Sequence, residues 1–142
     1  MQTATSITTV AHVIQLSVGP VFLLTGIGAM LSVLTNRLAR VVDRFRALNN
    51  TQDNERIGHE REMAQLLSRA RWIHWAISLC TVSALLICIV IAALFVGSEM
   101  NIDPSNAISI LFILAMLALI SGLLCFLREI FLATGLIEKY GK

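Results

Sequence analysis

The sequence predicts an all-α integral membrane protein with three transmembrane helices and a cytoplasmic helical hairpin between helices one and two. Of its 142 residues, 56% are hydrophobic and only 14% are charged, whereas ordinary soluble domains carry about 25% charged residues. Eight of the eleven Lys and Arg residues lie between Arg37 and Arg71, which leaves three uncharged stretches, residues 1–36, 72–98 and 104–127. Each stretch can supply the ~20 apolar residues that cross a bilayer.

The distribution of basic residues predicts the orientation, because Lys and Arg accumulate on the cytoplasmic side of membrane helices. The loop between the first two stretches holds eight arginines and the last three basic residues follow Leu127, whereas residues 98–106 hold none. We therefore expect the N-terminus outside and the C-terminus in the cytoplasm. The first stretch is expected to be retained rather than cleaved as a signal peptide, because no basic residue precedes it and no small-residue cleavage pattern follows it.

Residues 1–142 are expected to form a single membrane domain. Gly19 and Pro20 interrupt the first stretch, so residues 1–19 are expected to form an interfacial segment that ends in a break, with one smoothly kinked helix as the alternative. Apolar residues at helical spacing continue past the first arginines, so the first span and its cytoplasmic extension cover residues 20–48. A polar turn at residues 49–54 follows. The remaining segments are a cytoplasmic helix plus the second span at 54–97, the third span at 104–127, and an amphipathic cytoplasmic tail at 128–142.

Two of the expected helices carry a face of small or polar residues. Small faces let helix backbones approach closely in lipid, so one interpretation is packing within the chain or between copies of it. The sharper interpretation places the face of the first helix along a water-filled pore. The residues of these faces are Thr25, Gly28, Ala29, Ser32 and Asn36 on the first helix and Ala118 and Gly122 on the third.

Arg37, Arg40 and Arg44 follow the inner end of the first span. They could form a basic ring at the inner mouth of a pore, or they could bind anionic lipid headgroups and fix the topology. Five acidic residues dilute the charge of the same loop, so we expect no nucleic-acid partner.

Glu129 lies at the cytoplasmic end of the third span. A carboxylate near the bilayer is costly unless a cation pairs with it. Arg37 and Arg71 are the nearest cations by expected depth, so we expect one of them to form a structural ion pair with Glu129.

The sequence predicts neither catalysis nor a cofactor. No catalytic motif or metal-binding spacing occurs in it, and its three cysteines all fall within the expected spans. Small buried side chains are the simplest interpretation of those cysteines.

Several of these features resemble a family of small bacterial inner-membrane proteins that is classed only as a domain of unknown function. The resemblance covers residues 20–136 and rests on Pro20, on Asn36 and Arg37 at the inner end of the first span, and on Glu129 followed by isoleucine. It implies a three-helix protein of the bacterial inner membrane and no recorded activity. The chain departs from the family pattern at Arg128, where members often carry an aromatic residue.

The leading functional hypothesis is a homo-oligomeric membrane assembly that conducts ions or small solutes. The alternative is a non-conducting adaptor whose arginine-rich hairpin binds anionic membrane lipid or a protein partner. A ring of four or more copies would favour the first, and a monomer or dimer the second.

Overall fold

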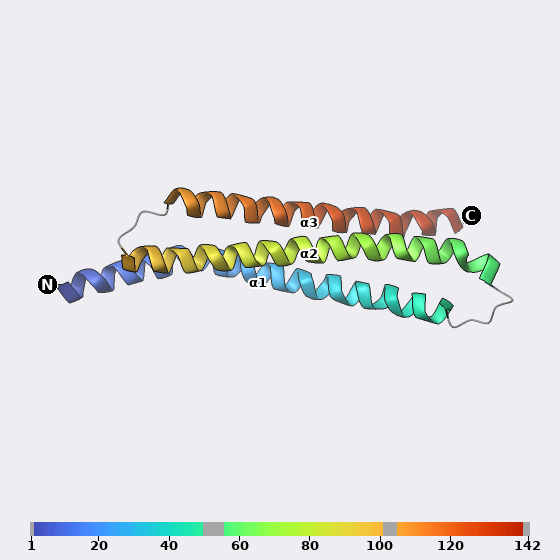
Figure 1. Cartoon of the computed structure of the whole chain (residues 1–142), viewed down its shortest axis with the longest axis horizontal. Coiled ribbons are helices and arrows are strands. Elements are labelled where there is room, and N and C mark those ends of the chain that lie inside the picture. The colour runs from blue at the N-terminus through green and yellow to red at the C-terminus, as the bar shows by residue number, and fades with distance from the viewer. Residues whose placement is uncertain (1, 50–55, 101–104, 141–142) are drawn as a thin grey trace. The chain divides into compact units, whose positions relative to one another are not determined.

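The computed structural model describes residues 2–49, 56–100 and 105–140, and all of these residues are helical. They form α1 (Gln2–Asn49), α2 (Arg56–Met100) and α3 (Ser105–Tyr140) (Figure 1). Side chains are described over residues 10–49, 63–98, 100 and 105–131. The all-α prediction is therefore confirmed.

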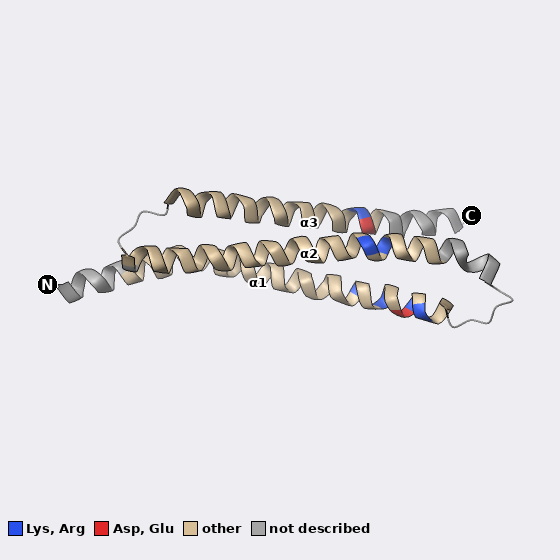
Figure 2. Ribbon diagram, in the orientation of Figure 1, with Lys and Arg blue, Asp and Glu red and all other residues tan. Residues whose placement is uncertain are grey.

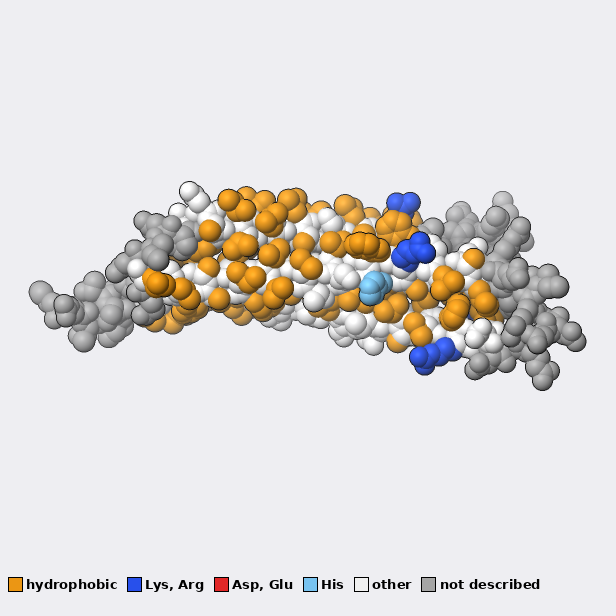
Figure 3. Space-filling view, viewed as in Figure 1, with side chains coloured by type: hydrophobic (Ala, Val, Ile, Leu, Met, Phe, Trp, Pro, Cys, Tyr) orange, Lys and Arg blue, Asp and Glu red, His pale blue; other side chains and the backbone are white. Residues whose placement is uncertain are grey.

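Each helix contains a stretch long and apolar enough to cross a membrane, namely Val10–Asn49, Met63–Ser98 and Ser105–Phe131. In the apolar windows that define these stretches, only 11%, 22% and 11% of the residues are buried within the chain. Most of their side chains face outward, and many of the exposed ones are hydrophobic, as the visible face in Figure 3 shows. Lipid, rather than water, is the solvent that such surfaces suit. The chain is a multi-pass membrane protein.

The predicted break at Gly19 is wrong, because α1 continues from Gln2 to Asn49 with Pro20 inside it. Proline removes one backbone donor and commonly ends a helix in water. In lipid, unwinding would leave further backbone groups without any partner, so a helix that continues through proline is favoured. The alternative of one helix through Pro20 is the one that agrees with the structure.

The third helix also extends beyond its predicted end, since α3 continues past residue 128 to Tyr140. The segment predicted as a separate tail is therefore, up to Tyr140, a continuation of the third span. The predicted turn at residues 49–54 lies outside the described residues apart from Asn49, as does the loop at residues 101–104. The cytoplasmic location of the hairpin stays a prediction.

The chain divides into two compact units, each built from a segment of all three helices. The first unit contains Met1–Met30 and Cys80–Leu119, and the second contains Leu31–Leu79 and Ile120–Lys142. In the first unit, the Ser83 hydroxyl donates a 2.8 Å hydrogen bond to the carbonyl of Ala115, and both residues are fully buried. This bond joins α2 to α3, and bonds of this kind contribute about 0.6 kcal/mol each in lipid.

Buried residues of the second unit recur at intervals of seven, the spacing of helices that pack with a left-handed twist. The seven-residue series are Leu34, Val41 and Leu48 on α1, Leu66 and Ile73 on α2, and Gly122 and Glu129 on α3. Every Asp, Glu and Arg whose side chain is described lies in this unit (Figure 2). Among the described residues, the second unit is therefore the place to look for a site built from charged side chains.

Candidate functional site

Glu129 is the centre of the charged cluster in the second unit. Its side chain occupies a core position of α3, seven residues after buried Gly122, and the residue is 0% exposed. A buried carboxylate is tolerated only when cations and hydrogen-bond donors compensate for its lost hydration. Glu129 must therefore be paired.

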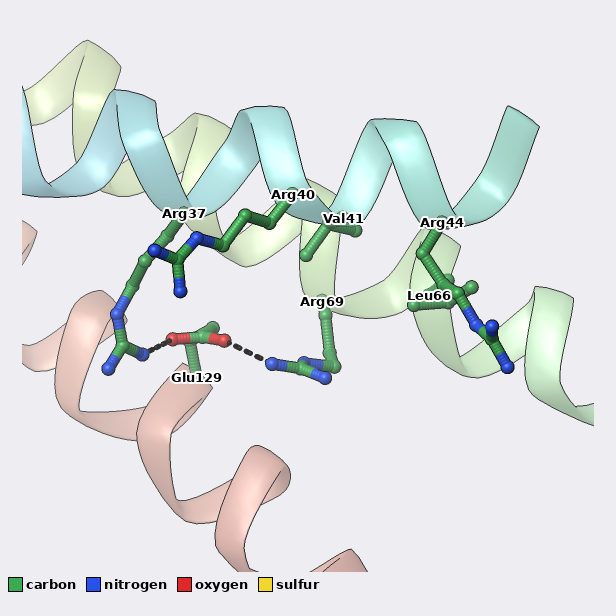
Figure 4. Close-up of a pocket in the computed structure, with 7 residues that line it drawn as sticks. All are labelled: Arg37, Arg40, Val41, Arg44, Leu66, Arg69 and Glu129. Carbon is green, nitrogen blue, oxygen red and sulfur yellow. Dashed lines mark hydrogen bonds and ion pairs between the residues drawn. The ribbon is translucent and has the colours of Figure 1, made fainter. Parts of the chain in front are cut away.

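Two arginines from different helices provide that pairing (Figure 4). Nη1 of Arg37, on α1, donates to Oε2 of Glu129 at 2.8 Å, and Nη2 of Arg69, on α2, donates to Oε1 at 2.9 Å. Each carboxylate oxygen thus accepts a charge-assisted hydrogen bond, the stronger kind of protein hydrogen bond. One carboxylate joins α1, α2 and α3.

The positions of both arginines follow from helical geometry. Arg37 comes three residues after buried Leu34, and Arg69 comes three residues after buried Leu66. Residues three apart lie on neighbouring parts of one helix face, so each guanidinium reaches the core from the edge of that face. The side chains keep 40% and 25% of their surface exposed, respectively.

Further contacts fix the orientation of Arg37 but leave part of Arg69 unsatisfied. The Arg37 guanidinium carbon lies 5.2 Å from the centroid of the Phe126 ring, close enough for a cation–π contact. The Nε atom of Arg69 is buried without a hydrogen-bond partner among the described residues. The cluster therefore has an unused buried donor beside its acidic centre.

A cavity of about 340 Å³ opens at this cluster. Four guanidinium groups and one carboxylate line it, so the formal charge of the lining is an excess of three positive charges. In Figure 4 the Arg40 side chain extends toward Arg37 and Glu129, whereas Arg44 extends away from Glu129 beside Leu66. The lining residues are Arg37, Arg40, Val41, Arg44, Leu66, Arg69 and Glu129.

The predicted ion pair between Glu129 and Arg37 is confirmed. Arg71, the alternative partner, is exposed and is not the residue that pairs; the second partner is Arg69, which was not predicted. Two residues correspond to about 200° of helix rotation, so Arg69 and Arg71 point in nearly opposite directions. The seven-residue spacing from Arg69 to buried Ala76 and Ser83 is the sequence signal that could have identified Arg69.

Arg128 does not join the cluster around Glu129, although it is the adjacent residue. Its guanidinium carbon lies 4.5 Å from the centroid of the Trp72 ring on α2, and its side chain is exposed. Successive helical residues point about 100° apart, which separates the two side chains. The departure from the family pattern at Arg128 therefore leaves the pairing of Glu129 intact.

The two small faces differ in their surroundings. On α3, Gly122 is buried and Ala118 is half-buried, so that face packs within the chain. On α1 the corresponding face is exposed, and a Cβ atom added at Gly28 would meet no atom within 4 Å beyond its chain neighbours and the adjacent backbone of its own helix. The exposed residues of the α1 face are Thr25, Gly28, Ala29, Ser32 and Asn36.

In this cluster, positively charged hydrogen-bond donors outnumber the carboxylate acceptors. Over the described ranges, no three His, Cys, Asp or Glu side chains gather where they could hold a metal ion. Guanidinium groups present planar, paired donors that suit the oxygens of carboxylates and phosphates. The arrangement is suited to binding an anion.

Three apolar helices joined by a buried carboxylate and two arginines define a multi-pass membrane protein with an arginine-lined cavity. The family described as "Protein of unknown function (DUF2721)" matches residues 17–139. The chain belongs to this family, which confirms the resemblance to a domain of unknown function. The comparisons with curated proteins and with solved structures find no match.

Proposed function

We propose that this protein binds a phosphate-class anion in its arginine-lined cavity, at the cytoplasmic surface of the bacterial inner membrane. The observation that carries the proposal is the composition of the cavity lining, which contains Arg37, Arg40, Arg44 and Arg69 but a single carboxylate. Arg37 and Arg69 share that carboxylate, and Arg40 adds a third guanidinium on the same side (Figure 4).

Electrostatic magnitudes favour occupation by an anion. Two unit charges about 4 Å apart interact by about 4 kcal/mol at the effective dielectric constant of a protein surface. The guanidinium groups of Arg37, Arg40 and Arg69 lie close to one carboxylate, so their mutual repulsion would be offset by a bound anion. The buried Nε–H of Arg69 adds a donor whose lost hydration costs about 1–3 kcal/mol when nothing accepts from it.

The cytoplasmic placement of the cavity rests on the clustering of arginines, which favours that side of the membrane. In a variant without native cysteines, a cysteine at exposed Ser105 should react with a membrane-impermeant thiol reagent in intact cells. A cysteine at exposed Asn49 should react only after the cells are opened. Labelling of position 49 but not of position 105 in intact cells would reverse the orientation.

The anion-binding proposal predicts that inorganic phosphate stabilises the detergent-purified protein more than chloride does at equal ionic strength. At tenfold excess over the dissociation constant, binding adds about 1.4 kcal/mol to the free energy of unfolding. This should raise Tm by about 4 °C. Arg40→Gln should remove most of this increment, because its side chain enters the cavity without bonding Glu129.

Arg46→Gln is the matched control, because Arg46 is an exposed α1 arginine that does not line the cavity. This variant should keep the wild-type response to phosphate. Equal stabilisation by phosphate and chloride, or an equal response of the Arg40→Gln variant and wild type, would refute the proposal.

A second candidate function is a homo-oligomeric channel, and the exposed small face of α1 favours it. Thr25, Ser32 and Asn36 lie on that face and point away from the core of the chain. Small residues on an exposed membrane face permit close contact with another helix, and polar side chains can line water. The Thr25 hydroxyl already donates to the Val21 carbonyl at 3.2 Å, so it can also face lipid. Leucine at Gly28 would obstruct such an assembly.

A further inference from the structure

We infer that the anion is supplied by the headgroup of an anionic phospholipid, which enters the arginine-lined cavity from the bilayer. The inference rests on the proposed anion binding and specifies its source. Phosphate oxygens are the shared chemistry of a free phosphate and a lipid headgroup. The surroundings of the cavity distinguish the two.

An aromatic residue stacked by a cation marks the level of the cavity relative to the bilayer. Trp72 follows Arg69 by three residues on α2, and Arg128, which stacks on its ring, is adjacent to Glu129 on α3. Tryptophan and arginine concentrate where hydrocarbon meets the headgroup layer. Trp75, one turn further along α2, is 57% exposed. These residues place the cavity at the depth of lipid headgroups.

The face of α3 that points away from the ion pair is apolar at the depth of Glu129. Leu127 and Phe131 flank Glu129 in sequence and are 47% and 68% exposed. Residues two positions from Glu129 point about 200° away from it, so these side chains lie on the side of α3 opposite to the ion pair. Exposed leucine and phenylalanine at this depth suit contact with acyl chains. Lipid chains therefore surround α3 at the level of Glu129, so the cavity lies at the depth where a phospholipid places its phosphate.

The cavity is basic and lies between membrane helices, as many phospholipid-binding sites do. Basic pockets between membrane helices on the cytoplasmic side characteristically bind phospholipid headgroups. Arg37, Arg40 and Arg69 exceed the Glu129 carboxylate by two positive charges, which accommodates a singly or doubly charged headgroup without reversing the local charge. A zwitterionic lipid carries its own cation, which the arginines repel.

The test is native mass spectrometry of the detergent-purified protein with phosphatidylglycerol or phosphatidylcholine added at equal concentration. Wild type should retain phosphatidylglycerol in preference to phosphatidylcholine. Arg40→Gln combined with Arg44→Gln should weaken phosphatidylglycerol retention by about thirtyfold, whereas Arg46→Gln should keep it. The Tm of each variant without added lipid, measured in parallel, checks that the variant is folded, and the bonds of Arg37 and Arg69 to Glu129 are present in all of them.

Each contrary outcome separates this inference from the proposed function. Equal retention of the two lipids, together with stabilisation by inorganic phosphate, would overturn the lipid source and leave anion binding intact. Equal losses of phosphatidylglycerol in the Arg46→Gln and double variants would show general charge attraction rather than a cavity, and would overturn the inference. Retention of neither lipid with no response to phosphate would overturn both proposals.

Discussion

Glu129→Gln is expected to lower the free energy of unfolding by about 3 kcal/mol, with Tm in detergent falling on the order of 10 °C. Glutamine keeps the size of the side chain but replaces one acceptor oxygen with an NH₂ group. Either Arg37 or Arg69 then faces a donor instead of an acceptor, and this happens at position 129, which is fully buried. Breaking a buried pair costs about 3–5 kcal/mol. The lower end applies because Arg37 keeps 40% of its side chain exposed.

Asp43→Asn is the matched control for this variant, because Asp43 is an exposed carboxylate on α1. Its loss should change stability by less than about 0.5 kcal/mol. If Glu129→Gln shifts the thermal midpoint no more than Asp43→Asn does, the ion cluster is not a source of stability.

A double-mutant cycle identifies the partners of Glu129. Arg37→Met and Arg69→Met should each couple to Glu129→Gln, so the double losses should be smaller than the summed single losses. Arg71→Met should add to Glu129→Gln without coupling, because its exposed side chain is not bonded to the carboxylate. Coupling through Arg71 with none through Arg69 would contradict the observed pairing.

The same substitution at two glycines should give opposite results for the stability of the single chain. Gly122→Leu is expected to destabilise it by about 2–3 kcal/mol, because Gly122 is buried and four added carbons must displace packed neighbours. Gly28→Leu should leave the chain at least as stable as wild type, since an added Cβ meets nothing within 4 Å beyond its chain neighbours and the adjacent backbone of its own helix. Leucine also favours a helix over glycine by up to about 1 kcal/mol.

Two measurements on these variants separate internal packing from assembly. Thermal unfolding in detergent reports the stability of the chain, and light scattering reports the mass of the protein in the micelle. If copies associate through the α1 face, Gly28→Leu should reduce that mass and abolish any conductance in reconstituted bilayers. Wild-type mass and conductance in the Gly28→Leu variant would exclude the α1 face as an interface, and a stable Gly122→Leu variant would contradict the observed core.

Features that depend on one helix at a time could be predicted from the sequence. Charge segregation located the three apolar spans, and the cost of a carboxylate near lipid identified Glu129 as a residue requiring a partner. Depth also made Arg37 one of two candidate partners, because it and Glu129 occupy corresponding ends of their spans. These predictions depend on depth along a helix, which residue number measures directly.

Features that depend on the rotation of one helix against another could not be obtained in this way. Arg69 and Arg71 have almost the same depth, and only the orientation of α2 determines which reaches Glu129. Gly28 and Gly122 likewise belong to similar small faces, yet only Gly122 is buried. The break predicted at Gly19 failed for another reason, because rules for proline in water underestimate how strongly lipid maintains a helix.

The order of the ion cluster along the chain has a consequence for biosynthesis. Arg37 and Arg69 belong to the first two helices, and their shared acceptor belongs to the third. Because a ribosome makes the chain from its N-terminus, both cations are synthesised before the carboxylate that pairs with them. Insertion of α3 therefore supplies the acceptor that the arginines of the other two spans share. An intermediate that contains only α1 and α2 would still lack the acceptor at its arginines, so complete assembly at this end of the chain requires all three helices.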